Sequence, residues 1–175
     1  MDKIISSLMA IIFLASVISV MGAEFSLGSG NDDWWTAYPD QSPDAGGDVN
    51  HPSWVLDALK KSPVLIYVQK SDSTCLPQTE AIHNIIDEFK GKITFLEISA
   101  DGSDSRSEEA LQAYDPNGDA MPVPLTVLLT LAPNYESEVV PVWHSTDEVT
   151  GDAWIENYVS DAINQYDEFS SDWNY

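Results

Sequence analysis

Four stretches of the chain have the apolar pattern of buried β-strands. The first three are nearly continuous in apolar residues, which is typical of strands that are buried on both faces of a sheet. The four stretches are residues 63–69 (PVLIYVQ), 92–99 (KITFLEIS), 124–131 (PLTVLLTL) and 139–144. The sequence therefore predicts a sheet with both faces covered.

Apolar residues at helical spacing mark the segments that would cover this sheet. They occur in residues 51–61, 76–90, 107–114 and 151–169. The resulting order is helix, strand, helix, strand, helix, strand, strand, helix, which predicts two parallel crossovers, then a hairpin and a closing helix. We expect an α/β protein built as a three-layer sandwich, with a mixed sheet of four to five strands and helices on both faces.

The N-terminal residues have a different pattern. Residues 4–23 carry no charge and follow Lys3, which is the layout of a secretory signal peptide. Twenty uncharged residues are also enough to span a hydrocarbon layer of about 30 Å as an uncleaved anchor. We expect residues 1–23 to be a signal peptide or an N-terminal membrane anchor. The mature protein would then be extracytoplasmic, either secreted or anchored by residues 4–23.

Residues 24–50 are rich in Gly, Ser, Asp and Pro, a composition that predicts a flexible acidic linker. Trp34, Trp35 and Tyr38 are unusual there. They could dock on the domain or on a partner, but we interpret them as aromatic residues of a tether. The C-terminal residues are again acidic and aromatic. The predicted division of the chain is 1–23, the linker 24–50, the domain 51–169 and the tail 170–175.

Charge narrows the classes of partner. The 175 residues include 29 Asp and Glu but only 7 Lys and Arg, which gives a formal net charge of -22. Phosphate backbones and anionic lipid headgroups would repel such a chain. We therefore expect no nucleic acid as a partner, and membrane contact only through an uncleaved N-terminal segment. The three histidines, His51, His83 and His144, have no metal-ligand spacing, so we expect no metal. The sequence has no Gly-rich phosphate loop, and we expect no other cofactor.

The order of the elements, with Cys75 between a buried strand and a helix, resembles the thioredoxin-like superfamily over residues 51–169. The run VLIYVQKSDSTCLPQTEAIHNIIDEF resembles the family's strand, active-site turn and long helix. Asp72 then stands at the first cysteine of the CxxC motif and Cys75 at the second, so the motif has become D-S-T-C. In VPLTVLL, Val123 and Pro124 resemble the stretch whose proline is cis and faces the active-site turn.

A second alignment of the motif is open. It places Cys75 at the first, exposed cysteine position and Gln78 where the second cysteine is missing, and it needs a turn three residues longer. In the first alignment, Ile66 replaces the family's buried aspartate and Glu80 replaces its helix-kinking proline. These departures argue against oxidoreductase activity.

The chemistry of a lone thiol limits the activity further. A helix N-terminus stabilises a thiolate, but the carboxylate of Asp72 is three residues away and opposes it. Because the chain has one cysteine, it cannot resolve a mixed disulfide by itself. We expect at most a weak monothiol exchange activity at Cys75, which could also link two copies as a disulfide dimer. The alternative is that Cys75 is a small buried apolar residue.

The resemblance also implies a binding function. A cis proline beside the turn exposes a backbone edge that can pair with an extended segment, and this needs no cysteine. We therefore predict an exported thioredoxin-like protein that acts by monothiol disulfide exchange or by binding a peptide or protein partner in a groove. The groove residues are Asp72, Ser73, Thr74, Cys75, Val123 and Pro124. The alternative function is a redox-inactive scaffold of the cell envelope.

Overall fold

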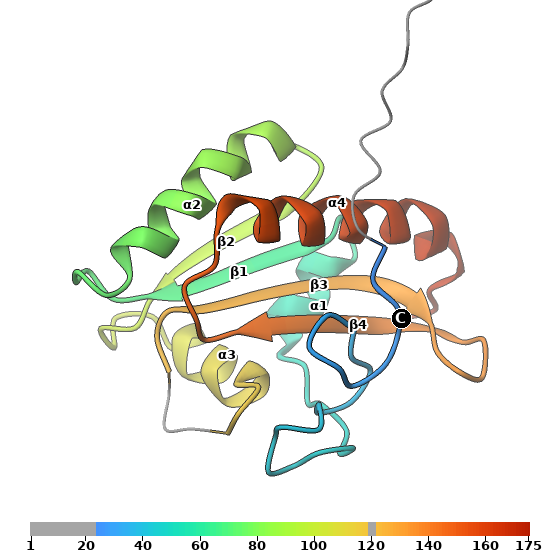
Figure 1. Cartoon of the computed structure of the whole chain (residues 1–175). Coiled ribbons are helices and arrows are strands. Elements are labelled where there is room, and N and C mark those ends of the chain that lie inside the picture. Colours follow the sequence, from blue (N-terminus) through green and yellow to red (C-terminus); the bar gives the residue numbers. More distant parts are fainter. Residues whose placement is uncertain (1–23, 119–121) are drawn as a thin grey trace, which may run out of the picture.

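The computed structural model describes residues 24–118 and 122–175 (Figure 1). The predicted signal peptide or anchor, residues 1–23, lies outside the described residues. In the described part, one sheet contains four strands, in the order β2-β1-β3-β4. The strands are β1 (Val64–Gln69), β2 (Thr94–Ser99), β3 (Leu125–Pro133) and β4 (Val139–Thr146). β1 is parallel to β2 and antiparallel to β3, and β3 is antiparallel to β4, so the predicted mixed sheet is confirmed.

Helices cover both faces of this sheet. They are α1 (Ser53–Leu59), α2 (Leu76–Ile86), α3 (Arg106–Tyr114) and α4 (Asp152–Phe169), with short 3-10 helices at Asp87–Phe89 and Ser170–Asp172. α2 and α4 lie on one face, and α1 and α3 lie on the other (Figure 1). This arrangement confirms the α/β sandwich of three layers. In the described part of the chain, no helix is long and apolar enough to cross a membrane.

The side chains of β1 alternate between the two faces of the sheet, and both faces are buried, which explains why β1 is a continuous apolar run in the sequence. Val64, Ile66 and Val68 pack in the core with α1 and α3, whereas Leu65 and Tyr67 pack in the core with α2 and α4. β2 differs, because it has a neighbouring strand on one side only. Of its residues only Ile98 is fully buried, so residues 92–99 form an edge strand and not the buried strand that the sequence predicts.

The N-terminal segment, residues 24–50, is not a flexible linker, so this prediction is wrong. Trp34 and Trp35 are 0% and 1% exposed. The backbone of Trp35 pairs with Trp143 along the outer edge of β4, with N to O distances of 2.7 and 3.0 Å. The segment therefore belongs to the packed body and lies beside β4 (Figure 1). The Gly, Asp and Pro content of this segment predicts a linker, but it does not reflect the large apolar area that its two tryptophans bury.

The C-terminal tail also contacts the body. Ser170–Asp172 continue from α4 as a 3-10 helix. Trp173 is partly buried against the core on the α1 and α3 side, and the ring of Tyr175 lies 4.2 Å from the Nζ atom of Lys60. A cation over an aromatic ring is weakly attractive at an exposed site. The tail therefore lies against the opposite face of the sheet from α4.

Candidate functional site

Cys75 lies between the end of β1 and the start of α2, as the sequence predicts. It is the N-cap residue of α2, and its carbonyl oxygen accepts the first helical hydrogen bond from the amide of Thr79 at 2.9 Å. Pro77 is in the first turn, where a proline costs no helical hydrogen bond. The sequence thus places the thiol at the mouth of the helix.

Asp72 organises the turn that precedes the helix. Its Oδ1 atom accepts hydrogen bonds from the amide of Thr74 at 3.0 Å, from the hydroxyl of Thr74 at 2.5 Å and from the amide of Cys75 at 3.3 Å. These hydrogen bonds, above all that of the Thr74 hydroxyl, lower the pKa of Asp72. Asp72, Ser73 and Thr74 are exposed, so the turn forms a polar rim.

The thiol itself is enclosed beneath this turn. Cys75 is 1% exposed, and its Sγ atom accepts a hydrogen bond from the amide of Lys70 at 3.4 Å. Tyr67 closes the site from the sheet, because its hydroxyl donates to the carbonyl oxygen of Cys75 at 3.0 Å. Burial raises the pKa of Tyr67. A buried thiol is inert compared with the exposed, electropositive thiols of redox enzymes.

The peptide bond between Val123 and Pro124 is cis. Leu125 follows it and pairs with Val68, one residue before the end of β1, so this peptide bond and the turn after Gln69 lie at the same end of the sheet. Pro124 is buried and Val123 is partly exposed. Among the described residues, the amide of Val123 has no hydrogen-bond partner.

Gln78, which in the second alignment only marks the place of a missing cysteine, holds the site together. Its side chain is fully buried. The Nε2 atom donates to the hydroxyls of Thr126 at 2.9 Å and Thr150 at 3.0 Å, and Oε1 accepts from the amide of Thr150 at 2.7 Å. These bonds join α2 to β3 and to the segment before α4. The sequence contains a sign that Gln78 is buried, because Gln78 lies on the same helix face as the apolar Ala81, Ile82 and Ile85.

No family model and no curated protein matches this chain. A solved structure described as "Structure of a malarial protein" is similar to this chain, with 13% sequence identity and a TM-score of 0.38. The similar region covers 60% of this chain and 97% of the chain in that structure. A similarity at this level supports no argument about function.

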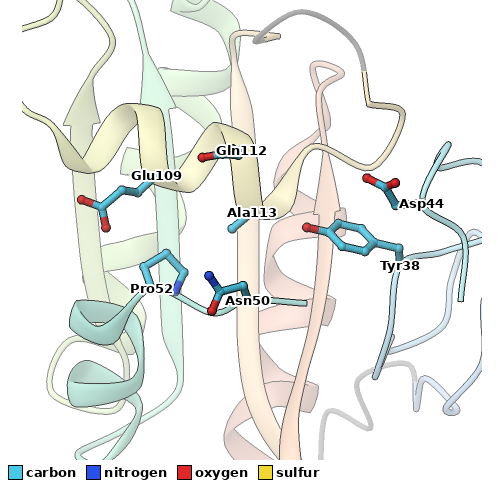
Figure 2. Close-up of a pocket in the computed structure, with 7 residues that line it drawn as sticks. All are labelled: Tyr38, Asp44, Asn50, Pro52, Glu109, Gln112 and Ala113. Carbon is cyan, nitrogen blue, oxygen red and sulfur yellow. The ribbon is translucent and has the colours of Figure 1, made fainter. Parts of the chain in front are cut away.

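A hollow of about 340 Å³ lies between the N-terminal segment and α3, on the side of the sheet away from the Cys75 helix. Figure 2 shows its lining, with Tyr38 pointing its hydroxyl toward α3. The lining residues are Tyr38, Asp44, Asn50, Pro52, Glu109, Gln112 and Ala113. Burial and the nearby carboxylate of Asp44 raise the pKa of Tyr38. Glu109 accepts a hydrogen bond from the indole of Trp54 at 3.0 Å, so part of the rim is already engaged in packing.

One buried histidine, His144, and one partly buried histidine, His51, make stability depend on pH. Burial lowers the pKa values of His51 and His144 to about 4, from an ordinary value of 6.5. The unfolded chain therefore binds these protons before the folded chain does. We expect the free energy of unfolding that the two neutral histidines contribute to be complete above pH 6.5 and to fall as the pH drops toward 4.

Urea unfolding of the wild type and a His51→Gln variant at pH 7 and pH 5 measures this effect. The variant should lose less stability than the wild type over this interval. His83→Gln is the matched control, because His83 is exposed and pairs with Glu97 at 3.1 Å. An equal loss in the wild type and His51→Gln would show that the partly buried imidazole of His51 does not cause the loss of stability between pH 7 and pH 5.

Proposed function

We propose that this chain is an exported thioredoxin-like domain that binds an extended peptide or protein segment and does not catalyse disulfide exchange. The burial of its only cysteine carries this proposal. Exchange requires a thiolate that a partner disulfide can reach in line, and a thiol that is 1% exposed beneath Asp72, Ser73 and Thr74 does not offer one.

Several features support the thioredoxin-like part of the proposal. They are the strand order β2-β1-β3-β4, the cysteine at the N-terminus of α2 and the cis bond before Pro124. The burial of Cys75 fits the D-S-T-C alignment, in which it takes the second cysteine position. It does not fit the alternative alignment, in which Cys75 would be the exposed first cysteine.

The surface beside the buried thiol fits a binding role. Leu76 is 54% exposed at the first residue of α2. The hydrogen bond between Gln78 and Thr126 holds the start of α2 next to the start of β3, so Leu76 and Val123 lie at the same end of the sheet. An extended segment can pair with the backbone of Val123 and place an apolar side chain on Leu76. Ser73 supplies a hydroxyl at the rim, and the hydroxyl of Thr74, which donates to Asp72, can still accept a hydrogen bond.

Thiol reactivity tests the absence of exchange. With a chromogenic aromatic disulfide at pH 8, Cys75 of the folded chain should react at least about 100-fold more slowly than in 6 M guanidinium chloride, because reaction requires local opening. The Cys75→Ser variant has no thiol and gives the background signal of the assay. Fast reaction of the folded chain, or formation of a disulfide dimer under mild oxidation, would contradict the proposal and favour monothiol exchange.

A displayed library of twelve-residue random peptides tests the binding. Peptides selected on the full chain should lose about tenfold in affinity for Leu76→Glu, because a buried apolar contact becomes a desolvated charge. Tyr135→Glu is the matched control, since Tyr135 is 82% exposed in the turn between β3 and β4, at the other end of the sheet. Selection of no peptide, or equal losses in both variants, would favour the redox-inactive scaffold instead.

A further inference from the structure

A second hollow, which we call the His144 pocket, lies where the end of β4 meets the start of α4 and the N-terminal segment. It has a volume of about 290 Å³. Trp35, Asn117, His144, Asp147, Glu148 and Trp154 are among the residues that line it. Pockets for drug-sized ligands start at about 300 Å³, so this hollow suits a group the size of one side chain.

The floor of the pocket contains a buried imidazole with one unused acceptor. His144 is 3% exposed, and its Nδ1 atom lies 2.8 Å from the carbonyl oxygen of Asp33 and 3.2 Å from the hydroxyl of Tyr158. A carbonyl oxygen only accepts, so Nδ1 carries a proton and donates it to Asp33. Nε2 is then an acceptor. It has no hydrogen-bond partner among the described residues, and His144 is one of the residues that line the pocket.

The charges around this imidazole have one sign. Asp147 and Glu148 bring carboxylates to the rim, and the amide of Asn117 donates to Asp147 Oδ2 at 3.1 Å, which orients that carboxylate. Asp32 and Asp33 lie close enough to act on His144 electrostatically. The lining comes from residues 31–41 and 116–154, and these parts of the sequence contain no Lys or Arg. The pocket therefore presents acceptors and negative charge.

Tryptophan rings complete the walls. The ring of Trp35 lies 4.2 Å from the ring of His144, and that of the partly exposed Trp154 lies 5.7 Å from it. The face of an indole attracts cations, and the attraction strengthens as the cation is desolvated. An aromatic wall beside carboxylates and a neutral acceptor is a suitable environment for an organic cation.

We propose that the His144 pocket binds the ammonium or guanidinium group of a small organic cation, which is either free or carried on a lysine or arginine side chain. His144 Nε2 and the carboxylates of Asp147 and Glu148 accept its N–H donors, and Trp154 covers its apolar stem. A metal ion fits less well, because the described residues contain no cluster of three or more His, Cys, Asp or Glu suited to one. This site is separate from the Cys75 turn and does not depend on the function proposed for that turn.

Titration of the full chain with agmatine, followed by calorimetry and by amide NMR shifts, tests this proposal. We expect saturable binding of agmatine and none of n-butylurea, which has similar size but no charge. Asp147→Asn combined with Glu148→Gln should weaken binding by about tenfold, as expected for two partly exposed ion pairs. Glu136→Gln with Glu138→Gln changes the charge equally at the opposite end of β4 and should leave the affinity unchanged.

A second variant and a second ligand complete the test. His144→Asn removes the Nε2 acceptor and should also weaken the binding of agmatine. Thermal melting checks that this variant folds. If it does not fold, the Asp147→Asn and Glu148→Gln double variant still tests the proposal. If the C-terminally amidated peptide Gly-Arg-Gly binds more tightly than agmatine, the cation belongs to a protein partner. If agmatine binds more tightly, the cation is a free amine. No saturable binding up to about 10 mM, equal binding of n-butylurea, equal losses in both charge variants, or preferential binding of Ca²⁺ would overturn the proposal.

Discussion

Replacing Trp34 with alanine should lower the free energy of unfolding by about 4 kcal/mol, because a fully buried indole leaves a large cavity in the core. Trp34 is completely buried and meets the ring of Tyr158 edge-on, with the ring centroids 5.4 Å apart. Its Nε1 atom donates to the buried carboxylate of Asp161 at 2.7 Å, so the variant also removes a donor from a buried charge. Urea unfolding of the full chain, followed by circular dichroism, measures the change.

The control for this prediction is Tyr135→Ala. Tyr135 is an exposed aromatic residue whose hydroxyl makes a long contact, 3.4 Å, with the carbonyl oxygen of Leu27. Its loss should cost less than about 1 kcal/mol. If Trp34→Ala costs as little as this control, residues 24–50 behave as the tether that their composition predicts.

Replacing Gln78 with alanine should lower the free energy of unfolding by about 3 kcal/mol. The variant removes the side-chain partners of Thr126 and Thr150 and leaves the amide of Thr150 without its acceptor. It also leaves a cavity between α2 and β3, since Gln78 is fully buried. Hydrogen exchange should additionally become faster at Thr150, which separates the loss of these bonds from a general loss of stability.

Gln112→Ala is the matched control, because Gln112 is an exposed glutamine in a helix of the same sheet sandwich. It should change the free energy of unfolding by less than about 0.5 kcal/mol. A similar small effect for Gln78→Ala would mean that the amide does not hold the start of α2 to β3. The placement of Leu76 and Val123 at the same end of the sheet, on which the proposed groove depends, would then lose its support.

The sequence predicted the secondary elements because each helix buries one periodic apolar face and the two central strands are buried on both faces. Val64 to Val68 and Leu125 to Leu131 are buried from both sides, which is why unbroken apolar runs identified them as strands. The same rule was wrong for residues 92–99, because Ile93, Phe95 and Leu96 give an apolar run although β2 is at an edge. Apolar runs of this kind therefore predict the presence of a strand more reliably than they predict how deeply the strand is buried.

The candidate site could be predicted only where its parts are local in sequence. The turn from Asp72 to Cys75 and the helix after it are adjacent in the chain, so their arrangement was accessible. The His144 pocket joins Trp35, His144 and Trp154, and neither spacing nor composition reports a contact between such distant positions. Trp34 and Trp35 were assigned to a tether because their neighbours are small and polar, whereas their burial depends on β4 and α4, which come more than 100 residues later.

The backbone pairing of Trp35 with Trp143 has a consequence for the state of the protein in solution. Unpaired strand borders template association with other chains, and folded proteins shield them. Here the shield is a single short bridge contributed from the N-terminal side. We expect proteolytic trimming past residue 35 to remove that bridge and expose the outer edge of β4, which would favour pairing with other copies of the chain.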